Sequence, residues 1–254
     1  NRLGDDKLVL QTLTPLLDSI NKSTRPGEFD DALVLAASSF LAAGRPKLAA
    51  GAAANYLKKQ PKGTNTADAL ATLVEASAQQ GNAADADRAL ARLVNDFAGS
   101  PLYGQTVHRL AERAYKARDF KRSERLFGTL VALGPRSPSH AVGLSGQGWS
   151  LFETKRYAEA AEVFAKVVEL HPKDDLAAEA AYKSAESYER AGNAPKAAAA
   201  FQLVARSYGM SSFAFLAARR GARLLTKQKK IDEADKAYSA LLEQFPKAKN
   251  RDTL

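Results

Sequence analysis

The stretch from Ala141 to Pro172 reads AVGLSGQGWSLFETKRYAEAAEVFAKVVELHP, and it decides the fold. With a period of 3.6 residues it forms two amphipathic helices, separated by a break at residues 154–156. Small residues such as Gly148 and Ala160 stand where two helix axes would cross, and larger apolar residues flank them. The stretch therefore predicts a hairpin of two helices, closed by a proline that cannot continue the second one.

The same unit recurs along the chain with a period of 37 residues. In each copy, a small residue of the second helix is followed four positions later by another apolar or aromatic residue. The six pairs, 37 residues apart, are Ala49/Ala53, Ala86/Leu90, Ser123/Phe127, Ala160/Phe164, Ala197/Phe201 and Ala234/Tyr238. A period without insertions predicts an array of stacked hairpins, each of which buries its apolar face on the next.

At these residues the chain resembles the tetratricopeptide repeat (TPR) family, whose two-helix unit combines a small residue, an aromatic four positions later and a closing proline. The best match is Ala160-x3-Phe164 with Pro172, followed by Ala234-x3-Tyr238 with Pro246. The resemblance covers about residues 30–250.

The chain departs from the family pattern in three ways, one of which is Ser123 at the small-residue position of the third repeat. Alanine or valine replaces the first-helix glycine in every unit except the one with Gly148, and the period exceeds the family's typical length of about 34 residues. Units lengthened in this way resemble those of bacterial cell-envelope proteins, including the Tol-Pal coordinator and outer-membrane-assembly lipoproteins. That likeness favours the periplasm or cell envelope over the cytoplasm.

The period and the resemblance predict an all-α, right-handed, TPR-like superhelical solenoid of about six helical hairpins. Residues 1–25 carry an additional N-terminal helix or half-repeat. We expect a single solenoid domain over residues 1–254, because no Ser/Gly-rich or Pro-rich linker interrupts the units. The half-unit at the start and the absence of a polar capping helix at the end predict a fragment of a longer array. The repeats start near residues 30, 67, 104, 141, 178 and 215.

The composition excludes several kinds of chemistry. The chain has no cysteine, which excludes disulfides, thiolate catalysis and cysteine-bound metals. No apolar run approaches the roughly 20 residues of a membrane span, so we expect membrane association only through a partner or a missing segment. The net charge of +9 favours acidic partners, anionic membrane surfaces or nucleic acid.

Motifs that superficially suggest a reactive site have simpler interpretations. Residues 143–148 read GLSGQG, but Gln147 stands where a G-x-S-x-G nucleophile elbow needs glycine, so we interpret this stretch as close helix packing. His108, His140 and His171 form no pair at metal-ligand spacing in the sequence, and His108 is expected to make an ordinary polar contact with Glu112, four residues later on the same helix face.

Carboxylates such as Glu159 and Glu162 alternate with basic residues, as on a solvated helix face. No catalytic, cofactor-binding or metal-binding residue can be nominated. We therefore expect that the chain is not an enzyme and that it has no cofactor and no small-molecule substrate.

The resemblance places function on the concave surface, which the exposed side of the first helices lines in such repeats. From the third repeat onward, these positions hold aromatic and arginine residues. Such residues are typical of a binding hot spot. The alternative is that Trp149 and Phe152 only pack against their own second helix. The family's carboxylate clamp is absent from the first repeat, where Val34 and Ser38 stand at the matching positions. The predicted partner-binding residues are Tyr115, Trp149, Phe152, Tyr182, Arg190, Arg219, Arg220 and Arg223.

These observations predict a non-catalytic protein–protein interaction scaffold that docks an acidic protein or peptide segment in its concave groove, within a bacterial multi-protein or envelope assembly. One alternative is a helical-repeat protein that binds RNA or another anionic polymer. The first-helix positions mix alanine, valine, serine, tryptophan and arginine, which argues against a base-reading code. Another alternative is an accessory helical region of a larger enzyme.

Overall fold

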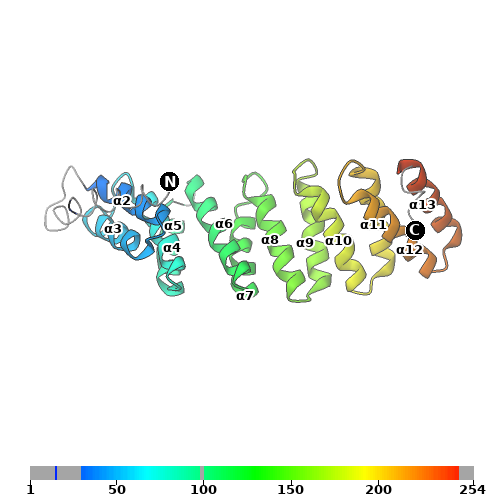
Figure 1. Cartoon of the computed structure of the whole chain (residues 1–254), viewed down its shortest axis with the longest axis horizontal. Coiled ribbons are helices and arrows are strands. Elements are labelled where there is room, and N and C mark those ends of the chain that lie inside the picture. Colours follow the sequence, from blue (N-terminus) through cyan, green and yellow to red (C-terminus); the bar gives the residue numbers. More distant parts are fainter. Residues whose placement is uncertain (1–14, 16–29, 98–99, 246–254) are drawn as a thin grey trace. The chain divides into compact units, whose positions relative to one another are not determined.

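The structure, a computed structural model, describes Pro15, residues 30–97 and residues 100–245. All regular elements in these residues are helices (Figure 1). Apart from Pro15, the helix predicted over residues 1–25 lies outside the described residues, as does Pro246. The helices are α2 (Asp31–Ala42), α3 (Pro46–Lys59), α4 (Thr66–Gln79), α5 (Ala83–Phe97), α6 (Pro101–Lys116), α7 (Phe120–Val131), α8 (His140–Glu153), α9 (Tyr157–Leu170), α10 (Ala177–Arg190), α11 (Ala194–Ser207), α12 (Ala214–Lys227) and α13 (Ile231–Gln244).

The predicted period is confirmed by the helix boundaries. The second helices of the hairpins, α3, α5, α7, α9, α11 and α13, each begin 37 residues after the previous one. The first helices begin within three residues of the predicted unit starts. The all-α repeat fold expected from the sequence is therefore present throughout the described residues.

The turn inside each hairpin has one residue in the left-handed region. In the fourth hairpin, Lys155 N–H donates to the Phe152 carbonyl (3.0 Å) and Arg156 N–H donates to the Leu151 carbonyl (2.9 Å). This pair of bonds caps the end of a helix and requires a positive φ between them. The residues with positive φ, again 37 apart, are Gly44, Gly81, Arg118, Lys155, Gly192 and Lys229.

Close packing explains the glycine-rich stretch at the start of α8. A Cβ atom on Gly146 would lie 2.4 Å from the Phe127 ring of α7, and one on Gly148 would lie 2.8 Å from the Phe164 ring of α9. Ala160 and Phe164 are fully buried. These contacts confirm the interpretation of residues 143–148 as a packing motif.

Internal contacts divide the chain into two compact units, residues 1–110 and 111–254, called here the first and second units. The first unit has a core that includes Leu33, Phe40 and Tyr56. The second has successive cores around Phe164 and Phe201. The predicted single domain and its right-handed superhelix over residues 1–254 concern both units together, and they stay predictions.

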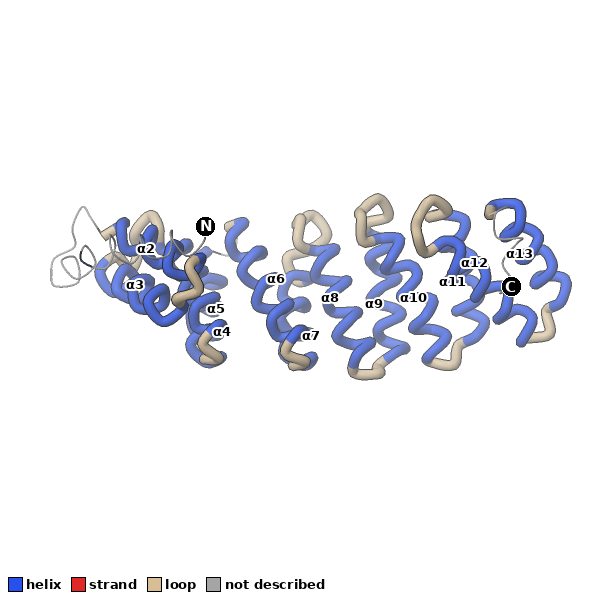
Figure 2. The backbone as a smooth tube through the Cα atoms, in the orientation of Figure 1, coloured by secondary structure: helices blue, strands red, loops and turns tan. Residues whose placement is uncertain are grey.

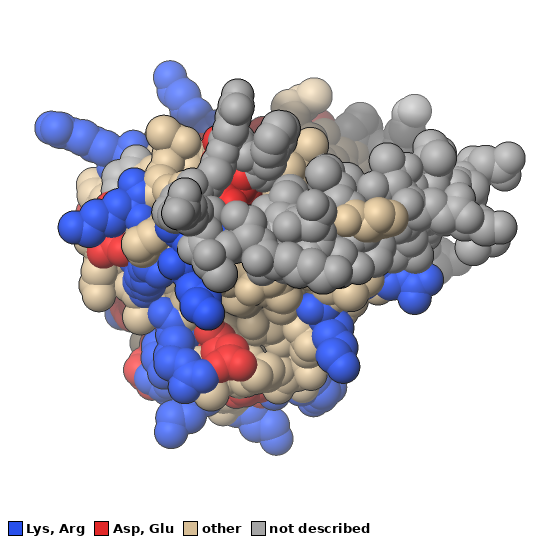
Figure 3. Space-filling view, turned by 90° about the vertical axis from the view of Figure 1, so that its left-hand side faces the viewer, with Lys and Arg blue, Asp and Glu red and all other residues tan. Residues whose placement is uncertain are grey.

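Lysine and arginine side chains project from much of the surface seen in Figure 3, and acidic side chains show in fewer places. This distribution agrees with the net charge of +9.

Candidate functional site

Three first helices of the second unit, α8, α10 and α12, bring most of the predicted partner-binding residues together. Their contacts join residues about one repeat apart, because neighbouring first helices lie side by side. We call the resulting group the first-helix cluster, and it consists of Trp149, Phe152, Tyr182, Lys183, Glu186, Glu189, Arg190, Arg220 and Arg223.

The aromatic side chains of the cluster are less exposed than the sequence analysis expected. Trp149 packs edge-on against Phe152 and Phe164, with ring centroids 5.8 and 5.9 Å apart. Phe152 is 8% exposed and Tyr182 is 9% exposed, since Tyr182 packs between the rings of Phe201 and Phe213. Trp149 is partly buried, so it offers the most accessible aromatic surface of these three residues.

Basic side chains lie over these rings. The Lys183 Nζ atom is 4.6 Å from the centroid of the Trp149 ring, and the Arg190 Cζ atom is 4.6 Å from that of Phe152. Arg220 donates a hydrogen bond of 2.8 Å to the Tyr182 hydroxyl. A cation over an aromatic face is held there by the ring quadrupole, so these pairs fix the positive charges in place.

Two carboxylates tie the cations into one network. Glu186, which is 8% exposed, accepts from Lys183 (2.7 Å) and Arg190 (3.1 Å). Burial works against the charged form, but Lys183, Arg220 and Arg190 together lower the pKa of Glu186 below its ordinary value. The carboxylate therefore stays ionised at neutral pH.

Glu189 on α10 links this network to the arginines of α12. It accepts from Arg220 (2.6 Å) and lies 3.4 Å from Arg223. Although burial opposes its charge, hydrogen bonds to Tyr182 and Glu189 raise the pKa of Arg220. With four cations against two carboxylates, the cluster keeps a net positive charge, and Arg223 is 52% exposed.

Two predicted residues lie outside this network. Tyr115 on α6 makes a long hydrogen bond of 3.5 Å to Glu153 at the end of α8, and its ring packs on Phe120. Burial, together with the Glu153 carboxylate, raises the pKa of Tyr115 to about 12. Arg219 is partly buried and forms no ion pair with any described residue.

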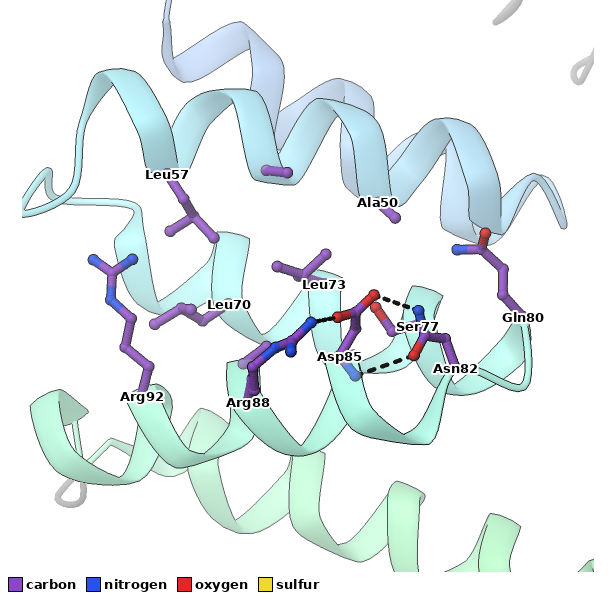
Figure 4. A pocket seen from close by; sticks show the side chains of 12 residues that line it. Ala50, Leu57, Leu70, Leu73, Ser77, Gln80, Asn82, Asp85, Arg88 and Arg92 are labelled. Carbon is purple, nitrogen blue, oxygen red and sulfur yellow. Dashed lines mark hydrogen bonds and ion pairs between the residues drawn. The ribbon is translucent and has the colours of Figure 1, made fainter.

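The first unit holds a groove on the side of the second helices, away from the predicted partner-binding positions, which all lie on first helices. The groove has a volume of about 510 Å³ and lies between α3 and α5, with α4 between them (Figure 4). Leu57, Leu70 and Leu73 line it, and Asp85 forms hydrogen bonds with Asn82 and an ion pair with Arg88 at one end.

A similar groove of about 480 Å³ lies between α9 and α11 in the second unit. Its lining includes Tyr188, whose hydroxyl donates to Glu162 (2.9 Å), and Lys196, which pairs with the same carboxylate (3.2 Å). Both grooves open between successive second helices, which explains their matching positions in the repeat.

The structure also brings together two histidines that the sequence analysis treated as separate. The Nδ1 atom of His140 lies 2.7 Å from the Nε2 atom of His171, because the start of α8 meets the end of α9. Within the described ranges, no group of three or more His, Cys, Asp or Glu residues could hold a metal ion. None of the helices described is both long and apolar enough to span a membrane.

Comparisons with known proteins agree with this geometry. Sequence models described as tetratricopeptide repeat match residues 108–175, 146–211 and 220–248, just over half of the chain. The C-terminal part of a TPR repeat-containing protein from Cytophaga hutchinsonii aligns with a TM-score of 0.60 at 13% identity, over 97% of this chain and 96% of its own. A tetratricopeptide repeat protein from Parabacteroides merdae gives a TM-score of 0.52 at 16% identity, over 86% of this chain and 80% of its own. No curated protein matches the sequence.

Proposed function

Because this chain belongs to the tetratricopeptide repeat family, we propose that it is a non-catalytic scaffold that docks an acidic partner segment on the first-helix cluster. Proteins of this family bind other proteins through their repeats. The observation that carries the proposal is the excess of fixed cations around Trp149: Lys183 and Arg190 are held over aromatic rings, and Arg223 remains half-exposed.

The geometry favours a partner that brings carboxylates and a modest apolar side chain. Phe152 and Tyr182 are already buried, so a large apolar anchor has little room, whereas Trp149 is only partly buried. Charge-assisted hydrogen bonds from arginine to carboxylates are stronger than neutral ones and impose geometry. An extended segment with Asp or Glu residues fits these requirements.

We place the scaffold in a bacterial multi-protein assembly of the periplasm or cell envelope. This part of the proposal rests on the likeness of the lengthened repeats to those of envelope proteins. Fractionation of the native host, with the chain detected by antibody, tests it: recovery with cytoplasmic markers alone would overturn the location while leaving the scaffold intact.

Trp149 offers a direct test, because it is the only tryptophan in the chain. Short synthetic peptides containing Asp or Glu, titrated into the full chain, should change the Trp149 emission, and added salt should weaken binding. Arg190→Ala and Arg223→Ala should each reduce the affinity, and a central anchor typically contributes about 2 kcal/mol or more, roughly thirtyfold.

Arg206→Ala is the matched control, since Arg206 is an exposed arginine on α11, outside the cluster. Equal losses of affinity for Arg223→Ala and Arg206→Ala would show that net charge, not the cluster, controls binding. Saturable binding of a homopolymeric RNA that Arg223→Ala weakens, with no peptide binding, would favour the nucleic-acid alternative.

A further inference from the structure

The turns between first and second helices of the second unit lie along one edge, the lower edge of the view in Figure 2. Contacts across successive hairpins hold this edge together. Arg156 donates to Glu124 near the start of the preceding hairpin's second helix (2.9 Å), and Gln228 donates to the carbonyl of Ala194, the first residue of α11 (3.0 Å). We call it the turn edge, and its turns span residues 117–119, 154–156, 191–193 and 228–230.

Three of these four turns place a basic residue where glycine is expected. Arg118, Lys155 and Lys229 have φ values of 61°, 62° and 60°, whereas the remaining turn has Gly192 at 79°. A residue with a Cβ in this conformation costs about 1 kcal/mol or more. All three basic side chains are exposed, and none forms an ion pair with a described residue. Arg118 lies over the Phe120 ring, but the side chains of Lys155 and Lys229 make no hydrogen bond, ion pair or ring contact with a described residue that would offset this cost.

A large apolar residue accompanies each of these cations. The first residue of the following helix is Phe120, Tyr157 or Ile231 in the three basic turns, but it is Ala194 after the glycine turn. Ile231 is 54% exposed. Cations interspersed with aromatic and aliphatic side chains are the composition of protein surfaces that contact the headgroup region of a membrane.

The opposite edge of the same unit lacks this charge. Its linkers, residues 132–139, 171–176 and 208–213, contain Arg136 and Lys173, which Asp174 and Asp175 balance. Counted with the residue before each turn and the two residues after it, the turn edge has three acids, Asp119, Glu153 and Asp232. On the same count it has nine basic residues, which are Lys116, Arg118, Lys121, Lys155, Arg156, Arg190, Lys227, Lys229 and Lys230.

We propose that the turn edge of the second unit binds the surface of a bilayer that contains anionic phospholipid. The chain would lie on this surface through its turns, with the first-helix cluster free for a partner. This contact goes beyond the sequence-based expectation of membrane association only through a partner or missing segment. It is independent of the proposed scaffold function.

Nucleic acid fits the edge less well. Bases bind non-specifically by stacking on aromatic faces. At this edge Arg118 lies over the Phe120 ring, with its Cζ atom 5.6 Å from the centroid, and Arg190 lies over the Tyr157 ring at the same distance. The rings are therefore covered on one face, whereas Lys155, Lys229 and Ile231 are exposed and available to headgroups.

The test is co-sedimentation of the full chain with vesicles of phosphatidylcholine, with and without phosphatidylglycerol. The edge variant replaces three cations, Arg118→Gln, Lys155→Gln and Lys229→Gln. The control variant, Arg136→Gln, Lys173→Gln and Arg206→Gln, removes three exposed cations elsewhere in the same unit, so both variants have a net charge of +6 in place of +9.

We expect the parent to bind only the anionic vesicles. Added salt should release it, because salt screens the attraction between surface charges over a distance of about 8 Å at physiological ionic strength. The edge variant should bind about a hundredfold more weakly, because each Lys or Arg near an anionic surface contributes about 1 kcal/mol. The control variant should stay within tenfold of the parent. Circular dichroism should show both variants equally helical.

Three outcomes would overturn the proposal. Parent binding that is absent, or equal on neutral and anionic vesicles, excludes an electrostatic lipid contact. Equal weakening of both variants shows that total charge is responsible. Binding of single-stranded RNA that the edge variant loses, without vesicle binding, assigns the edge to nucleic acid instead.

Discussion

The two units share one backbone period but fill their hairpins with bulky side chains at different positions. In the first unit Ala53 stands where the second unit has Phe164, three periods later, and Tyr56 stands where it has Val167. All four are fully buried. The large ring has moved by three residues along the helix, about one turn, so the period fixes the arrangement of helices without fixing which position holds the ring.

This shift has consequences for both units. The Tyr56 hydroxyl reaches the linker after α3 and accepts a hydrogen bond from the backbone N–H of Asn65 (3.2 Å). The match to the family models begins at residue 108. The repeat that starts there is the first in which an aromatic residue, Phe127, follows four positions after the small residue, Ser123. A repeat can therefore keep its geometry after it has lost the side-chain pattern by which its family is recognised.

Removing the large buried ring of each unit should give the largest loss of stability. Tyr56→Ala and Phe164→Ala should each destabilise the chain by about 3–5 kcal/mol, because each leaves a large cavity. Hydrogen exchange should show lost protection in α2–α5 for Tyr56→Ala and in α8–α11 for Phe164→Ala. Leu203→Ala, at a leucine that is 43% exposed, is the control and should change little. The comparison fails if either truncation loosens both units equally.

A single substitution, glycine to alanine, should have opposite signs in the two units. In the second unit Gly146→Ala drives a methyl group into the Phe127 ring and should cost about 1–3 kcal/mol. In the first unit Gly51 lies on the exposed side of α3 with nothing within 4 Å of a Cβ atom. Gly51→Ala should therefore stabilise by about 0.5–1 kcal/mol. Urea denaturation of both variants measures this, and shifts of the same sign would contradict it.

The hairpin turns sharpen the comparison further. Both turns of the first unit have glycine in the left-handed position, whereas three of the second unit's four have Lys or Arg. Lys155→Gly should stabilise by up to about 1 kcal/mol, since it relieves the conformation, and Gly44→Lys should destabilise by about 1–2 kcal/mol. Denaturation midpoints check both. A stabilised Gly44→Lys variant would show that the turn conformation is not strained.

Mild acid should affect the second unit more than residues 30–97, which contain no histidine. Burial and the neighbouring His171 lower the pKa of His140 below 6.5. The unfolded chain then binds a proton at a higher pH than the folded one, so stability falls as the pH drops below about 6.5 and levels off below the folded-state pKa. Hydrogen exchange at two pH values, corrected for intrinsic rates, should show weakening around α8 and α9. His140→Gln should abolish that difference.

Much of the fold could be predicted because hairpin packing leaves a local signature. Small residues at Gly148 and Ala160, with Phe164 one turn beyond, follow directly from helix geometry. The positive φ of Arg118 and Lys155 could not be predicted in this way, since neither residue type indicates a left-handed turn. Only their place in the 37-residue register, shared with Gly44, Gly81 and Gly192, could have shown it.

The candidate site was predictable in position but not in its contacts. The sequence placed Tyr182 and Arg220 on first helices. It did not show that Arg220 donates a hydrogen bond to Tyr182, or that three cations lie close to the Glu186 carboxylate. Lys183 was missed because its contact with Trp149 depends on how neighbouring first helices pack. The His140–His171 contact was missed for a related reason, since it joins the two ends of one hairpin.

The register that builds the first-helix cluster also makes its parts exchangeable by recombination. Arg220 lies one period after Lys183, and Arg223 lies one period after Glu186. An in-frame loss of residues 177–213 would join α9 directly to α12 and bring Arg220 to the place over Trp149 that Lys183 holds. The cation–aromatic pair would survive such a crossover, while an acidic position would become basic. Gene-level gain or loss of a repeat can therefore retune the charge of this surface without interrupting the array.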